Sequence, residues 1–92
     1  MTNAGYFEST QRVSVTDSPN GFTVDGPVDS RRAFYICADV TVHVQRNGDA
    51  TTDAMRIPAN VPVRIHTFGN DDVSFVKGDG ADDGSVWVTL TD

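Results

Sequence analysis

The chain has 92 residues, a length that allows a single domain with a small core. Its 13 acidic side chains outnumber the 7 basic ones and give a net charge of −6, which argues against a nucleic-acid partner and against an anionic membrane surface. The single cysteine excludes an intrachain disulfide, so the chain is not a disulfide-stapled secreted domain, and synthesis in a reducing compartment fits. We expect neither a signal peptide nor a transmembrane segment, because the first ten residues lack a basic and an apolar part and no long apolar run exists.

The first ten residues show no periodicity of a helix or a strand. We therefore expect residues 1–10 to form a flexible N-terminal arm and residues 11–92 to form a single β domain. Tyr6 and Phe7 are adjacent aromatic residues in this otherwise small and polar segment. Two interpretations are open: a frayed terminus, or an arm that docks on a neighbouring subunit with the two rings as anchors.

Most of the rest of the chain consists of short segments in which apolar and polar side chains alternate, the period of a half-buried strand, and residues 33–38 are apolar on both faces, as fits a buried central strand. The expected strands are residues 11–16, 22–24, 33–38, 38–46, 54–57, 61–68, 73–77 and 85–90. No segment keeps a helical period. About eight short strands separated by turn residues predict an all-β fold, a compact β-barrel or β-sandwich of antiparallel strands.

The most regular alternation runs from Ala38 to Arg46, where valines at positions 40, 42 and 44 face one way and polar side chains face the other. Asn47-Gly48 follows, and this pair predicts a tight hairpin turn, because both residues tolerate positive φ. Asp39 is the only charged residue between this strand and the apolar segment 33–38. We expect a bend at Asp39 that separates two strands; the alternative is one long strand with a bulge.

No group of residues predicts catalysis. We expect His43 and His66 to face solvent, because both lie on polar strand faces and a zinc site needs three or four ligands. The loop Gly78–Gly84 could gather calcium ligands, but its spacing differs from that of an EF-hand, and we expect an acidic turn. The serines lie outside a nucleophile elbow, and turn formation explains the aspartates. We expect no enzymatic activity, no metal and no other cofactor.

Some large apolar side chains lie away from the expected core. Trp87 is opposite the apolar face of the last strand, and Phe68 and Val76 also lie off the apolar faces of their strands. Either both sheet faces are covered, or a cluster centred on Trp87 forms an interface, and we favour the interface. The candidate interface residues are Tyr6, Phe7, Phe68 and Trp87.

Several short phrases in residues 36–90 carry a family resemblance. These phrases are Cys37–Val40, Ala50–Asp53, Ile57–Pro62, Asp72–Val76 and Gly84–Leu90. Together they resemble small virion proteins of tailed bacteriophages, the head-decoration or minor head proteins. The resemblance implies a compact β-barrel or sandwich without enzymatic activity. Residues 1–35 lie outside it.

On this basis we expect a non-enzymatic structural protein that binds and stabilises a phage head, as a decoration or cement-type protein. The expected partners are the major capsid protein or neighbouring virion subunits, and we expect a homo-oligomer, a trimer at local symmetry points of the capsid. The expected location is the capsid surface of the virion, after synthesis in the cytoplasm of the bacterial host. Two alternatives are a carbohydrate- or ligand-binding β module that uses Trp87, Tyr35 or Phe68 for stacking, and a tail or adaptor component of the virion.

Overall fold

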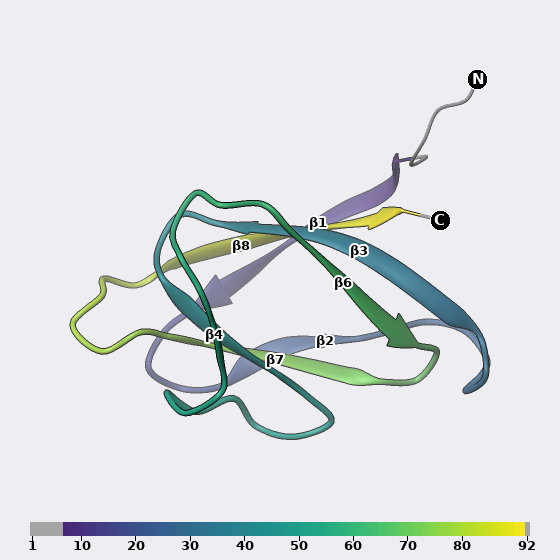
Figure 1. The fold of residues 1–92 in the computed structure, drawn as a ribbon, viewed down its shortest axis with the longest axis horizontal. Helices are drawn as coiled ribbons and strands as arrows, with labels where there is room; N and C mark the ends of the chain where they lie inside the picture. Colours follow the sequence, from purple (N-terminus) through teal and green to yellow (C-terminus); the bar gives the residue numbers. More distant parts are fainter. Residues whose placement is uncertain (1–6, 92) are drawn as a thin grey trace.

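The computed structural model describes residues 7–91 as a β-sandwich of two four-stranded antiparallel sheets (Figure 1). The strands are β1 (Phe7–Val15), β2 (Asn20–Thr23), β3 (Arg31–Ala38), β4 (Val42–Arg46), β5 (Met55–Ile57), β6 (Val63–Phe68), β7 (Asp72–Lys77) and β8 (Gly84–Thr91). Sheet A has the strand order β1-β8-β3-β6, and sheet B has the order β2-β7-β4-β5. The all-β prediction is confirmed, and because the two sheets stay separate the fold is a sandwich and not a barrel. Within residues 7–91 no helix is long and apolar enough to cross a membrane.

The core lies between the two sheets and consists mainly of valines with a small group of aromatic rings. Val42 and Val88 are fully buried, so the predicted inward face of β4 and β8 is confirmed. The ring of Phe22 joins the layers: it contacts Phe34 of sheet A edge-on, with ring centres 5.3 Å apart, and stacks with Phe75 of sheet B at 6.3 Å. Aromatic contacts of this kind add stability beyond the area that they bury.

The predicted bend at Asp39 is confirmed and carries the chain from one sheet to the other. β3 ends at Ala38 in sheet A, and β4 begins only at Val42 in sheet B. The Asp39 carboxylate accepts a hydrogen bond of 2.8 Å from the Ser85 amide, and the Asp39 amide donates one of 3.1 Å to the Ser85 carbonyl oxygen. These two bonds fix the crossing to the start of β8.

Strand β1 begins at Phe7, four residues before the expected start at Gln11. The backbone of Phe7 is paired with Thr91, and Thr10 is paired with Thr89, with an irregularity between these two pairs. The last part of the expected arm is therefore a strand of sheet A. Tyr6 and the side chain of Phe7 lie outside the described part of the chain.

The tight hairpin predicted at Asn47-Gly48 is wrong. Val44 is paired with Met55, so residues 47–54 form a longer loop between β4 and β5. Asn47 does have the positive φ expected of it, 54°. The loop folds over sheet B because the Ala50 amide donates a 3.0 Å hydrogen bond to the Ser74 hydroxyl of β7, and Ala50 itself is buried.

Two further differences from the sequence predictions lie in β4 and β7. His43 was expected to face solvent and Val76 was expected on an exposed face, yet both are buried, with 8% and 6% of their surface exposed. They are paired across β4 and β7, on the side of sheet B that faces away from the core. Nδ1 of His43 lies 2.9 Å from the carbonyl oxygen of Ala54 at the end of the loop. The loop thus lies against the part of this face around His43, whereas Thr23, Gln45, Arg56 and Asp72 on the same face stay exposed.

Candidate functional site

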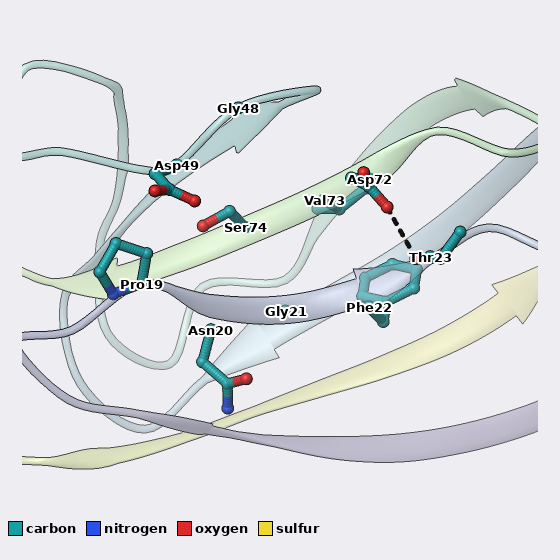
Figure 2. Close-up of a pocket in the computed structure, with 10 residues that line it drawn as sticks. All are labelled: Pro19, Asn20, Gly21, Phe22, Thr23, Gly48, Asp49, Asp72, Val73 and Ser74. Carbon is teal, nitrogen blue, oxygen red and sulfur yellow. Dashed lines mark hydrogen bonds between the residues drawn. The ribbon is translucent and has the colours of Figure 1, made fainter.

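A shallow depression of about 330 Å³ lies along β2 and the adjoining part of β7 (Figure 2). Several of its polar groups have hydrogen-bond partners within the chain. The Thr23 hydroxyl donates a 2.7 Å hydrogen bond to the Asp72 carboxylate, and the Ser74 hydroxyl accepts a hydrogen bond from the Ala50 backbone amide. Because these groups are in use and the depression is open, it does not have the converging free polar groups of a ligand site.

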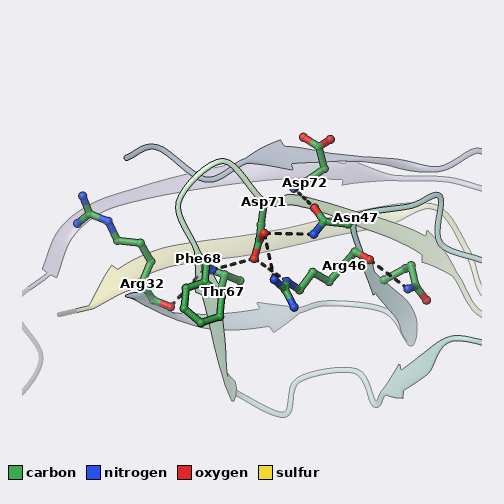
Figure 3. Close-up of polar contacts among 8 residues, drawn as sticks. Arg32, Arg46, Asn47, Thr67, Phe68, Asp71 and Asp72 are labelled. Carbon is green, nitrogen blue, oxygen red and sulfur yellow. Dashed lines mark hydrogen bonds and ion pairs between the residues drawn. The ribbon is translucent and has the colours of Figure 1, made fainter. Parts of the chain in front are cut away.

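Asp71 is the centre of the most connected polar cluster (Figure 3). Its buried carboxylate accepts hydrogen bonds from Nε of Arg46 at 2.6 Å, from the Asn47 amide group at 3.1 Å and from the Phe68 backbone amide at 2.8 Å. The backbone carbonyl oxygen of Asp71 also accepts a 2.8 Å hydrogen bond from the Val24 backbone amide. One side chain thereby joins the end of β4 to the turn between β6 and β7.

The electrostatics of this cluster indicate a structural role. The hydrogen bond from Arg46 and the one from the Phe68 amide lower the pKa of Asp71 from 3.8 to about 2. The same contact raises the pKa of Arg46. The Arg46 guanidinium also lies 5.5 Å from the centre of the Phe68 ring, a cation–π contact. A carboxylate whose pKa lies this far below neutral pH is a poor general base. Its role is to hold the end of β4 against the turn between β6 and β7.

The acidic loop between β7 and β8 projects from one end of the molecule (left in Figure 1). Asp83 forms an ion pair of 2.9 Å with Lys77, and this hydrogen bond raises the pKa of the lysine. Asp79 and Asp82 are exposed. Among residues 7–91 no group of three or more histidine, cysteine or acidic side chains is close enough to hold a metal ion.

The remaining candidate is the side of sheet A that faces away from the core, here called the outer face of sheet A. The cross-strand register places on it Thr10, Arg12 and Ser14 of β1; Arg31, Ala33, Tyr35 and Cys37 of β3; Arg64, His66 and Phe68 of β6; and Ser85, Trp87, Thr89 and Thr91 of β8. Directly opposite residues of paired strands point to the same side of a sheet, which fixes this set from backbone pairing alone.

Two rings stand on the middle strands of this face. Trp87 of β8 is opposite Cys37, and Tyr35 of β3 is opposite Thr89, so the two aromatic residues are diagonal neighbours, typically about 7–8 Å apart. Tyr35 is 45% exposed and Trp87 is 41% exposed. The hydroxyls of Thr10 and Thr89 are 2.8 Å apart and form a hydrogen bond beside them.

The predicted interface residues Trp87 and Phe68 share this face but are not neighbours. Trp87 is opposite Cys37 and Phe68 is opposite Arg31, so they lie six positions apart along β3, about 20 Å at the usual rise of a strand. The residue that the structure places beside Trp87 is Tyr35. The available signal was the side-chain period of a strand, because it puts Tyr35 on the face opposite Phe34 once residues 33–38 are taken as a strand.

The fold and this surface define a class of protein: a small β-sandwich with exposed aromatic rings on the outer face of sheet A, and without a metal cluster among the described residues. Comparisons with protein-family models, with curated proteins and with solved structures gave no match.

Proposed function

We propose that this chain is a non-enzymatic structural protein of a tailed-bacteriophage virion that decorates the capsid, and that the outer face of sheet A makes the contact. The observation behind the proposal is the pair Tyr35 and Trp87, which are diagonal neighbours on one sheet face and are 45% and 41% exposed. The loop between β4 and β5 lies against the part of sheet B around His43, but no comparable loop hides these two rings, which stay partly exposed. The resemblance of residues 36–90 to head-decoration proteins supports the choice of partner.

The proposed mechanism is thermodynamic. A subunit that binds the assembled shell better than the free capsid protein stabilises the shell by mass action. Three copies joined as a trimer would dock together, and each further contact would raise the avidity without a new kind of interaction. Aromatic rings near the centre of an interface contribute most of the binding energy, which is the role proposed for Tyr35 and Trp87.

A carbohydrate-binding module is the second candidate, because two neighbouring rings can stack on sugar rings. The polar groups of the outer face fit this candidate less well. Sugar hydroxyls both donate and accept hydrogen bonds; the carboxylates of Asp and Glu accept from them, and the amides of Asn and Gln do both. None of these residue types is among the side chains described on the outer face of sheet A.

Occupancy on particles tests the proposal. We expect particles of the phage that encodes this chain to contain it in many copies, measured by quantitative mass spectrometry. Trp87→Ala and Tyr35→Ala are each expected to weaken binding to undecorated capsids by about 30-fold, since a central aromatic contributes about 2 kcal/mol. Met55→Ala is the matched control, because Met55 is also exposed (53%) but belongs to sheet B. Absence of the protein from particles, or equal binding by all three variants, would refute the proposal.

A further inference from the structure

The outer face of sheet A differs in charge from the rest of the chain. The basic side chains on this face are those of Arg12, Arg31, Arg64 and His66. No carboxylate is among the described side chains of the face. The whole chain has 13 acidic and 7 basic side chains, so taking away these three arginines leaves 4 basic side chains against all 13 acidic ones. A protein that is acidic overall therefore presents one basic face.

The arginines and the rings have an ordered arrangement across the sheet. Arg12 on the edge strand β1 is directly opposite Trp87, and Arg64 on the other edge strand β6 is directly opposite Tyr35. The Arg64 guanidinium lies 5.9 Å from the centre of the Tyr35 ring. Both arginines are exposed. An apolar centre with a charged rim is the usual anatomy of a protein–protein contact.

From this arrangement we infer that the outer face of sheet A binds an acidic protein surface, one that offers an apolar patch to Tyr35 and Trp87 and carboxylates to Arg12 and Arg64. The inference rests on the proposed function and adds the chemistry of the partner. Guanidinium groups only donate hydrogen bonds and match the paired oxygens of a carboxylate in a planar, two-pronged geometry. Charge complementarity of this kind fixes orientation and speeds association.

The same groups fit a nucleic acid less well. Single-stranded binders do combine aromatic stacking with basic side chains. Their affinity, however, comes from many neutralised phosphates, whereas this face supplies only Arg12, Arg31 and Arg64, and the remainder of the chain would repel a polyanion. An acidic patch on a protein carries only a few carboxylates, so the three arginines on this face are enough to pair with it.

The test uses charge reversal at the rim. Binding of the full-length protein to undecorated capsids of the encoding phage is measured at 50 and 300 mM NaCl for wild type, Arg12→Glu with Arg64→Glu, and the control Arg56→Glu. Arg56 is exposed in β5 of sheet B. We expect wild-type binding to weaken with salt, and the double variant to bind at least 10-fold more weakly at 50 mM NaCl with a flatter salt dependence. The control is expected to follow wild type.

Each other outcome has a separate meaning. Wild-type protein that does not bind capsids would contradict the proposed function itself. Wild-type binding that the double variant reproduces at both salt concentrations would overturn the acidic partner and leave the proposed function intact. Binding of a 30-nucleotide poly(dT) probe at 150 mM NaCl, lost in the double variant, would replace the acidic protein by a nucleic acid. A changed oligomeric state of the free double variant in sedimentation velocity would show that a second copy of the chain occupies this face, and would also overturn the inference.

Discussion

Replacing Phe75 by alanine is expected to lower the free energy of unfolding by about 3–5 kcal/mol, the usual range for a buried phenylalanine. Phe75 has no exposed surface, and its ring stacks with that of Phe22 at the contact between the sheets. Its removal forfeits the transfer energy of the ring and leaves a cavity that the valines around it cannot fill. Urea denaturation followed by fluorescence measures the change as a lower midpoint with an unchanged slope.

A loss of this size is a large part of the free energy of unfolding of a small domain and could unfold the alanine variant. A conservative second variant is therefore measured beside it. Phe75→Leu keeps most of the volume and is expected to cost no more than about 1.5 kcal/mol. Equal and small effects of both substitutions would show that Phe75 is not at the centre of the core, and that the packing of the two sheets described above is wrong.

Asp71→Asn is expected to lower the thermal midpoint at pH 7, since the variant leaves Arg46 beside an uncharged amide and gives the Phe68 amide a weaker acceptor. The effect depends on pH. The pKa of Asp71 is about 2 in the folded protein, against an ordinary value of 3.8, so the folded state binds this proton more weakly than the unfolded chain. The carboxylate therefore contributes stability above about pH 4, and this contribution is lost as the pH falls toward 2.

Thermal unfolding between pH 2 and 7 measures this dependence. The difference in midpoint between wild type and Asp71→Asn is expected to be largest above pH 4 and to shrink toward pH 2. Asp72→Asn is the control, because Asp72 is exposed and an amide oxygen can still accept the hydrogen bond of the Thr23 hydroxyl. A constant difference for Asp71→Asn over the whole range would show that its carboxylate is not held in the charged form by Arg46.

The sequence was sufficient to predict the number and the approximate positions of the strands, because each strand is a local run of strand-forming residues, although β1 and β4 each begin four residues away from the expected start. The inward valines of β4 and β8 and the bend at Asp39 are local features, and all are confirmed. The burial of His43 could not be predicted from the sequence pattern, because it depends on a loop that folds back over the polar side of β4. The tight turn at Asn47-Gly48 failed for the same reason: the buried Ala50 and its bond to Ser74 favour the longer loop.

The candidate site was predictable only in part. The alternation showed that Trp87 lies off the core face, which is a local fact. That Tyr35 is its neighbour depends on the pairing of β3 with β8, two strands about fifty residues apart in sequence, and no periodicity specifies such an order. The two arginines at the rim required the positions of β1 and β6 as well. Asp71 could not be singled out among many aspartates in turns, because its partner Arg46 comes from another strand.

We propose that the capsid is bound through the outer face of sheet A. A cryo-electron microscopy reconstruction of particles from the phage that encodes this chain, at a resolution that separates the two sheets, tests it most directly. We expect a β-sandwich on the outside of the shell with sheet A turned toward the shell, and with Tyr35 and Trp87 covered by capsid protein. A sandwich bound through sheet B, with Tyr35 and Trp87 facing solvent, would contradict it.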